Sequence, residues 1–372
     1  MLEKLIYIIL LCGFLAGCSE RKEQEKVIAP WGEVVDSVTY GDDFDLEQIQ
    51  GSGEMILLTL SGPEFYYDYH GRPLGTQYLL AEKFAQELGV RLRVELCRDS
   101  AEMVARLQAD EGDIMASTEV GRLVASPGKG HLDSELKRWY KPSMLDEVRR
   151  QEARLLSHSS VKRRVFSPML DRKSGVISHY DALFMQYCRS IRWDWRLMAA
   201  QCYQESTFDP KATSWAGAKG LMQIMPTTAD LLGLPRDQMY DPEPNIAAAA
   251  RYLGQLEQKF SDIHDRRERT NFILAAYNGG IHHIRDAMAL CERDGHNPHQ
   301  WTAVSEYVLK LSQPSYYNDP IVKSGYMRGT ETVDYVSKIN ERWQSYRHVR
   351  TPRQGFTQEP RRAKRSADKY KL

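Results

Sequence analysis

The segment from Asp194 to Pro226 most constrains how this chain folds, because a helical pattern there leads directly into a turn rich in small residues. Asp194 is a good N-cap, and apolar residues then recur at helical spacing toward Glu205. Pro210 prevents the helix from continuing far past Glu205. A glutamate at the end of a buried helix is costly to ionise, so we expect a raised pKa, as a general acid requires. An exposed glutamate on an ordinary core helix is the alternative.

The composition is that of a globular protein with room for two domains. The chain has 372 residues, of which 42% are hydrophobic and 27% are charged. Its formal net charge is zero, so no overall field favours nucleic acid as a partner. We expect no zinc site, because the cysteines of the folded part are widely spaced and form no CxxC pair, and the chemistry argued below needs neither a metal nor a cofactor. These cysteines are Cys97, Cys188, Cys202 and Cys291. Buried free thiols are expected, although an exported setting would permit a disulfide, with Cys188 and Cys202 nearest in sequence.

The first residues predict export. Lys4 precedes an apolar run over residues 5–15 that is too short for a comfortable membrane span and has the layout of a signal peptide. The sequence Leu15-Ala16-Gly17-Cys18 resembles a bacterial lipobox. The resemblance implies a signal peptide over residues 1–17, lipidation of Cys18 and a lipoprotein anchored to a membrane, with the outer membrane facing the periplasm as the expected place. A plain signal peptide with an incidental cysteine is the alternative.

Residues 18–52 are polar and predict a tether, and residues 53–145 predict a small α/β module. Strand patterns occur over residues 55–60, 91–96 and 113–116. Between them lie two helical patterns, one over residues 76–88 and a second that Ser100 is predicted to cap and Gly112 to end. This order predicts parallel strands joined by right-handed crossovers. A tyrosine-rich loop over residues 63–71 is expected to form a structural aromatic cluster, with binding of a peptide or sugar as the alternative.

The module resembles the first lobe of the periplasmic solute-binding proteins that capture amino acids. The likeness is carried by the strand over 55–60 and by the segments GRPLGTQYLLAEKFAQELGVRLRV and LQADEGDIMAS. Complete members close two lobes around a ligand, whereas residues 118–174 are too short for a second lobe and include two helical patterns. The resemblance therefore implies a truncated module, with a small peptide or a muropeptide as its conceivable ligand. Residues 146–176 are expected to be a linker.

Helical patterns dominate residues 177–347 and predict a compact all-α domain, so the expected class is a multidomain α+β protein. Ser178 and Asn245 are predicted helix caps, and Pro226 is predicted to open a short helix that ends at Gly233. Residues 348–372 are basic, lack apolar periodicity and predict a disordered tail.

Three segments add polar side chains that could share a cleft with Glu205. SWAGAKGLMQ, residues 214–223, is a turn whose small residues would let a polymer approach the backbone. LAAYNGG, residues 274–280, places Tyr277 and Asn278 at a helix end, and GTETVDYV, residues 329–336, brings Tyr335 onto the last helix. Taken singly, Asn278 reads as a helix cap and the two tyrosines as core aromatics.

Together, Glu205-Ser206, Gly220-Leu221-Met222-Gln223, Ala276-Tyr277-Asn278 and Glu331-Thr332 with Tyr335-Val336 resemble the catalytic domain of family 1 lytic transglycosylases, which has a goose-type lysozyme-like fold. The resemblance implies that Glu205 is the only catalytic acid and base. It implies peptidoglycan glycan strands as the substrate, cut between MurNAc and GlcNAc to leave 1,6-anhydromuramoyl ends during cell-wall remodelling and turnover. The implied substrate-binding residues are Ser214, Gly220, Gln223, Met225, Tyr277, Asn278, Glu331 and Tyr335.

The sequence also departs from the family pattern. Gly279-Gly280 stands where many members have Ala-Gly or Ser-Gly, and Val333 stands where an arginine is common. Most glycosidases use two carboxylates, but no second one stands out near Glu205, since Asp209 precedes a proline and fits a turn cap better. One carboxyl group suffices if the substrate supplies its own nucleophile. A hydrolytic lysozyme and an inactive peptidoglycan-binding lipoprotein are the alternatives.

Overall fold

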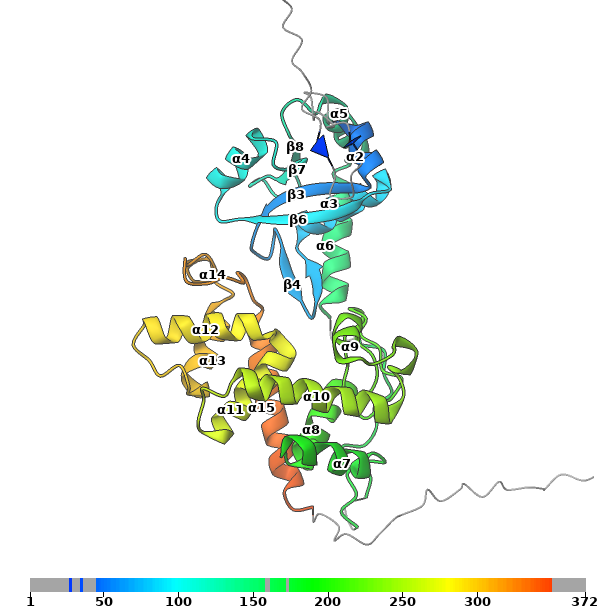
Figure 1. The fold of residues 1–372 in the computed structure, drawn as a ribbon, viewed down its shortest axis with the longest axis vertical. Helices are drawn as coiled ribbons and strands as arrows, with labels where there is room; N and C mark the ends of the chain where they lie inside the picture. Colours follow the sequence, from blue (N-terminus) through cyan, green and yellow to red (C-terminus); the bar gives the residue numbers. More distant parts are fainter. Residues whose placement is uncertain (1–26, 29–33, 36–44, 158–160, 172–173, 350–372) are drawn as a thin grey trace, which may run out of the picture.

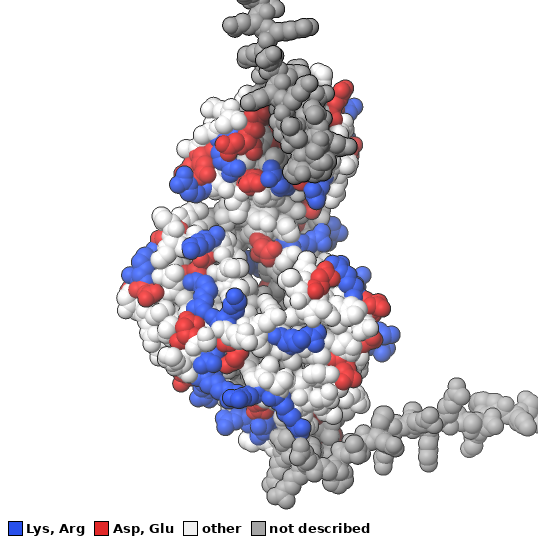
Figure 2. Space-filling model, in the orientation of Figure 1, with Lys and Arg blue, Asp and Glu red and all other residues white. Residues whose placement is uncertain are grey.

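The computed structural model describes residues 27–28, 34–35, 45–157, 161–171 and 174–349. The predicted signal peptide, Cys18 and nearly all of the predicted basic tail lie outside these residues. Within the described part, no helix is both long and apolar enough to span a membrane. Residues 45–156, here called the N-terminal module, and residues 177–349, the helical domain, form the upper and lower parts of Figure 1. On the face shown in Figure 2, acidic and basic side chains are interspersed over both parts, in keeping with a formal net charge of zero.

The N-terminal module is built on a small mixed sheet with the strand order β6-β3-β7-β8. The central strand β3 (Glu54–Leu60) runs parallel to β6 (Arg91–Cys97) and β7 (Ile114–Ala116), as the strand and helix order predicted. The edge strand β8 (Leu123–Ala125) is antiparallel to β7. Helix α3 (Thr76–Leu88) ends at Gly89, as predicted, in the left-handed conformation that glycine adopts readily. Helix α4 (Ser100–Gln108) is capped by Asp99 and not by Ser100, because the Asp99 carboxylate accepts a hydrogen bond from the Glu102 amide.

The module extends further in both directions than the sequence predicted. The end of the expected tether forms helix α2 (Leu46–Ser52), whose Ile49 is fully buried. The start of the expected linker belongs to α6 (Ser143–Leu155), which packs on α3 and buries Val148. Helix α2 was missed because a short helix with one buried side chain has little apolar periodicity, whereas α6 was predicted as a helix and only its assignment to the linker differs. The two helices predicted after residue 130 are confirmed as α5 (Gly130–Trp139) and α6, while β1 (Val27–Ile28) and β2 (Val34–Val35) form a separate antiparallel pair.

The tyrosine-rich segment is a β-hairpin and not the predicted loop. Strands β4 (Tyr67–Tyr69) and β5 (Arg72–Leu74) pair antiparallel, and Figure 1 shows the hairpin extending from the sheet toward the helical domain. At its base, Tyr67 is buried, and its hydroxyl donates to Glu152 on α6 (3.0 Å). A structural aromatic cluster is confirmed there, since the Tyr67 ring also meets that of Tyr326, from the helical domain, edge to face at 5.1 Å.

The helical domain has the all-α composition that was predicted. Helix α8 (Trp195–Ser206) packs against α7 and α15, and together with α10 and α11 these helices enclose one apolar core. The domain's helices are α7 (Asp181–Ile191), α8, α9 (Pro226–Leu232), the 3-10 helix η3 (Arg236–Gln238), α10 (Pro242–Lys259), α11 (Arg266–Gly279), α12 (Ile281–Arg293), α13 (Trp301–Lys310), α14 (Pro314–Tyr317) and α15 (Gly329–Tyr346). The four cysteines of the described chain are buried free thiols, as expected.

The predicted caps were partly right. Asp194 caps α8 through a hydrogen bond from the Arg196 amide, and α9 runs from Pro226 to a left-handed Gly233. Ser178 is not the cap of α7, because the serine itself donates to Asp181 in the first turn. Asn245 is not a cap either: α10 begins three residues earlier, at Pro242, and Asn245 is fully buried inside the helix.

Candidate active site

Glu205 lies one residue before the end of α8, on the side that faces α15. The helix stops because Thr207 adopts a left-handed conformation (φ 53°), so the end comes before Pro210 and independently of it. The half-buried Glu205 carboxylate accepts a 2.5 Å hydrogen bond from the hydroxyl of Tyr335 at its Oε1. Tyr335 is itself buried, and its oxygen accepts a hydrogen bond from Nε2 of Gln201 on α8 (3.1 Å). The tyrosine is thus held between two polar groups of the same helix.

The surroundings of Glu205 favour its protonated form. Burial raises the pKa of Glu205 to about 7, even though the hydrogen bond from Tyr335 and the positive charges of His70 and Arg163 act to lower it. The negative charge of Glu331 adds to the rise. The raised pKa expected from the sequence is therefore present, and it leaves Glu205 able both to give and to take a proton near neutral pH.

The turn after α8 is fixed by its own side chains. Oγ of Ser214 accepts from the Ala218 amide (2.9 Å), and Nε2 of Gln223 donates to the carbonyls of Ala212 (3.2 Å) and Gly220 (2.9 Å). Gly220 is needed for a close approach, because a Cβ there would lie 2.3 Å from the Met239 carbonyl oxygen. In this arrangement Ser214 and Gln223 shape the turn, and both amide hydrogens of Gln223 are used within it.

Asn245 anchors the same turn, which the sequence did not reveal. Its Oδ1 accepts from the buried Met222 amide (2.8 Å), while its Nδ2 donates to the carbonyls of Lys219 (3.1 Å) and Met239 (2.8 Å). These contacts join α10 to the turn at two points and to Met239, just after η3, at a third. The only sign in the sequence was a polar residue within an otherwise apolar helical stripe.

Tyr277 and Asn278 lie at the end of α11 and connect the turn to the last helix. The Tyr277 hydroxyl donates to the Met222 carbonyl (2.8 Å), and Oδ1 of Asn278 accepts from Thr332 (2.8 Å). Burial and the nearby Glu205 carboxylate raise the pKa of Tyr277 well above its usual value, so this hydroxyl stays protonated. The next residue, Gly279, has no room for a side chain, because a Cβ there would lie 2.6 Å from the Thr332 hydroxyl. This contact explains the departure from the family pattern at Gly279.

Glu331 is held by the hairpin of the N-terminal module. Nε2 of His70 lies 3.0 Å from its Oε1, and the Tyr69 hydroxyl donates to its Oε2. Burial acts to raise the pKa of Glu331, but the hydrogen bond and charge of His70, together with Tyr69 and Arg328, lower it to about 2. The pKa of His70 is in turn raised, because the hydrogen bond and charge of Glu331 outweigh the effect of burial. His70 and Glu331 thus form an ion pair between the two parts of the chain.

Aromatic stacking fixes the same contact. The Tyr69 ring lies parallel to that of Trp215, with centroids 5.9 Å apart and an interplanar angle of 12°. The guanidinium of Arg328 lies 5.3 Å from the Tyr69 ring, and that of Arg72 lies 5.6 Å from Trp215. Neither Tyr69 nor His70 was among the predicted site residues, because nothing local in the sequence shows that residues about 260 positions apart meet.

The predicted site residues therefore fall into three groups. Glu205 and Tyr335 are in direct contact, and Tyr277 and Asn278 connect α11 to the turn and to α15. Ser214, Gly220 and Gln223 build the turn, while Met225 lies at its end, where a Cβ on Gly71 of the hairpin would be 3.4 Å from its Cε. Glu331 pairs with the hairpin. Across the described ranges no group of three His, Cys, Asp or Glu side chains is arranged to hold a metal ion.

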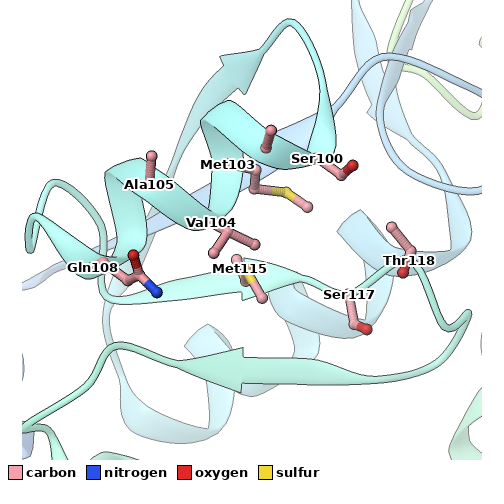
Figure 3. A pocket seen from close by; sticks show the side chains of 9 residues that line it. Ser100, Met103, Val104, Ala105, Gln108, Met115, Ser117 and Thr118 are labelled. Carbon is pink, nitrogen blue, oxygen red and sulfur yellow. The ribbon is translucent and has the colours of Figure 1, made fainter.

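A separate hollow lies in the N-terminal module and contains none of these residues. It has a volume of about 570 Å³ and lies between α4 and the strand β7 (Figure 3). Its lining is mixed, with the apolar side chains of Met103, Val104 and Met115 and the hydroxyls of Ser117 and Thr118. The hollow is open to solvent and remote from Glu205 in sequence and in structure.

Comparison with known proteins identifies the helical domain. Residues 183–298 match the family described as "Transglycosylase SLT domain". The chain is similar to two proteins named membrane-bound lytic murein transglycosylase F. That of Desulfosudis oleivorans is 42% identical over 40% of this chain and 32% of its own length, and that of Pseudomonas putida strain W619 is 29% identical over 89% and 71%. The first curated relatives are thus matched over about a third of their length.

Among solved structures, the 70 kDa soluble lytic transglycosylase of Escherichia coli is 28% identical over 45% of this chain and 24% of that protein, with a TM-score of 0.33. The SLT match over residues 183–298 spans the segments that contain Glu205, Gln223 and Tyr277. The chain therefore carries a transglycosylase SLT domain and is related to the membrane-bound lytic murein transglycosylases F.

Proposed function

We propose that this protein is a peptidoglycan lytic transglycosylase in which Glu205 acts first as the general acid and then as the base. The observation that carries the proposal is the Glu205 carboxyl group, half-buried in an SLT domain, bonded to Tyr335 and titrating with a pKa of about 7. The bond cut is the β-1,4 linkage between MurNAc and GlcNAc, and the setting is cell-wall remodelling and turnover.

The reaction needs one carboxyl group and the substrate's own hydroxyl. Protonated Glu205 gives its proton to the glycosidic oxygen as the bond to C1 of the muramoyl residue breaks. The carboxylate then takes the proton of the C6 hydroxyl, whose oxygen attacks C1 and closes the 1,6-anhydro ring. Tyr335 donates a hydrogen bond to Glu205 throughout, which stabilises the carboxylate formed midway. The N-acetyl group of the sugar can stabilise positive charge at C1, as in substrate-assisted glycosidases.

The other carboxylates near Glu205 are already occupied, which favours this route over hydrolysis. Asp209 accepts from the amides of Arg164 (2.6 Å) and Lys211 (3.0 Å), in the capping role that was expected. Glu331 uses one oxygen for His70 and the other for Tyr69. Both carboxylates are therefore engaged by protein groups, unlike the unengaged carboxylate that activates water in an inverting glycosidase.

We assign the remaining predicted residues to glycan binding around this centre: Ser214, Gly220, Gln223, Met225, Tyr277, Asn278, Glu331 and Tyr335. The domain limits given above, the goose-type lysozyme-like fold and the solute-binding-like origin of the N-terminal module belong to the same proposal. So does anchoring through a lipidated Cys18 at the outer membrane, of which the names of the relatives support only the attachment to a membrane. A small peptide or a muropeptide stays the predicted ligand of the module.

Product analysis tests the proposal. Purified peptidoglycan is digested with the full chain, and the fragments are identified by mass spectrometry. We expect 1,6-anhydromuramoyl ends, and we expect Glu205→Gln to abolish their release while Glu306→Gln, at an exposed glutamate on α13, leaves it unchanged. Reducing muramic acid ends would mean hydrolysis, and release by the Glu205 variant at the parent rate would remove Glu205 from the mechanism.

A further inference from the structure

The turn of the β4–β5 hairpin contributes a charged side chain to the environment of Glu205, although it belongs to the other part of the chain. His70 lies in the two-residue turn between the strands, with a left-handed backbone (φ 52°). That conformation is uncommon for a residue other than glycine and points the turn into the helical domain at a local cost. The contacts of Tyr69 with Trp215 and Arg328 hold the hairpin there.

Glu331 and Tyr335 lie four residues apart on α15, so both side chains are on the same face of the helix. Tyr335 bonds Glu205, and Glu331 bonds His70. A second carboxylate this close to Glu205 would disfavour the ionised form of the acid, and with it the carboxylate that must form in the middle of the reaction. The positive charge of His70 offsets the charge of Glu331 at that place.

We propose that His70 is a positioning residue of the active site, which holds Glu331 through their ion pair and balances its charge next to Glu205. The proposal rests on the proposed function, because it concerns how the same acid works. It gives the N-terminal module a direct part in the chemistry: the module completes the charge balance of a site whose acid lies in the helical domain.

The other charged and titratable groups around the pair stay in place in every variant used below. Glu205 also faces the hydroxyls of Tyr335 and Tyr277, the thiol of Cys202 and the guanidinium of Arg163, while Arg328 and Tyr69 face Glu331 and Asp68 faces His70. The variants therefore change only the charges at positions 70 and 331.

The test is the pH dependence of kcat/KM on short soluble peptidoglycan glycan fragments, measured with the full chain between pH 5 and 9. Activity falls on the alkaline side as Glu205 loses its proton. In His70→Gln the negative charge of Glu331 is left unbalanced. The alkaline limb of the pH profile, where activity falls, is therefore expected to move to higher pH by about half a pH unit or more. In His70→Lys the positive charge is kept, and the limb is expected at or slightly below its parental position.

The double variant His70→Gln/Glu331→Gln supplies the decisive comparison. Both charges are then gone, so the limb is expected to return toward that of the parent even though the ion pair is broken. A merely structural role predicts that the Gln and Lys variants at position 70 behave alike and that the second substitution restores nothing. That result, or an unshifted limb in His70→Gln, would overturn the proposal. If the parent itself releases no anhydromuramoyl product, the proposed function has failed instead.

Discussion

The hydroxyl of Tyr335 lies 2.5 Å from Oε1 of Glu205, and this hydrogen bond joins α8 to α15 through two residues that are 130 positions apart in sequence. It connects the acid to α15, the helix that also carries Glu331 toward the hairpin. The same helix therefore supplies the hydrogen-bond donor of the acid and the charge that the hairpin holds.

Replacing Tyr335 with phenylalanine should slow the reaction and move its pH profile. A hydrogen bond to a charged group contributes about 1.5–3 kcal/mol, so kcat should fall by roughly 10- to 100-fold. The pKa of Glu205 should rise, because the bond from Tyr335 lowers it in the parent, and the alkaline limb should move up. Tyr277→Phe is the matched control, since its hydroxyl bonds the Met222 carbonyl and not Glu205. An equal shift of the limb in both variants would contradict the role given to Tyr335.

Replacing Glu205 with glutamine should stabilise the fold at neutral and alkaline pH. The pKa of Glu205 is about 7 in the folded chain, against roughly 4.3 for glutamate in an unfolded one. Between these values the folded state binds more protons than the unfolded state, so the parent loses stability as the pH rises. Glu205→Gln has no such loss and should be more stable by about 1–3 kcal/mol at pH 8, with little difference at pH 4.5. Thermal melts at the two pH values, with Glu306→Gln as the control, measure the effect; a constant difference would argue against a raised pKa.

Asn245 should contribute more to the stability of the fold than a helix cap does. Replacing it with alanine removes the partner of the Met222 amide and of the Met239 carbonyl, while the Lys219 carbonyl keeps its bond from the Ile224 amide, so the free energy of unfolding should fall by about 2–4 kcal/mol. Removing an ordinary cap costs about 1 kcal/mol. Asp265→Ala supplies that comparison, because Asp265 caps α11 through the amides of Arg267 and Glu268. Urea unfolding of the two variants distinguishes the roles, and equal losses would restore the capping interpretation of Asn245.

Much of this site could be read from local sequence, because helix caps, apolar periodicity and glycine turns act over a few residues. The opening of α9 at Pro226 was predicted on that basis and is confirmed, whereas α8 ends near Glu205 as expected but through Thr207 and not through Pro210. The Asn245 prediction failed because a buried amide that bonds a distant turn has the same local pattern as a cap. The end of the predicted N-terminal tether is instead the helix α2, which was missed because Ile49 is its one buried residue.

The contribution of the hairpin could not be predicted for a different reason. Tyr69 and His70 meet Glu331 across 261 or more residues, and no periodicity or spacing records such a contact. The tyrosine-rich composition of the segment indicated an aromatic cluster, which is present at Tyr67. It gave no sign that the tip of the hairpin contacts Glu331, since this depends on how the two folded parts dock.

Gly279 tests how closely α11 and α15 must approach at the site. A Cβ at this position would lie 2.3 Å from Cε of Met327 and 2.6 Å from Oγ1 of Thr332, whose hydroxyl bonds Asn278. The Met327 side chain can move aside, because the contact is at its flexible end. The Thr332 side chain cannot, because it is β-branched, with few allowed χ1 rotamers, and its hydroxyl is held by a hydrogen bond. Gly279→Ala should therefore separate Thr332 from Asn278, lower the free energy of unfolding by about 1–3 kcal/mol and reduce activity. Gly51→Ala is the matched control, because Gly51 lies in α2 with no atom within 4 Å of an added Cβ, and alanine favours a helix there. If Gly279→Ala proves as stable and active as the parent, the close approach at Thr332 is not needed, and the departure from the family pattern has no steric cause.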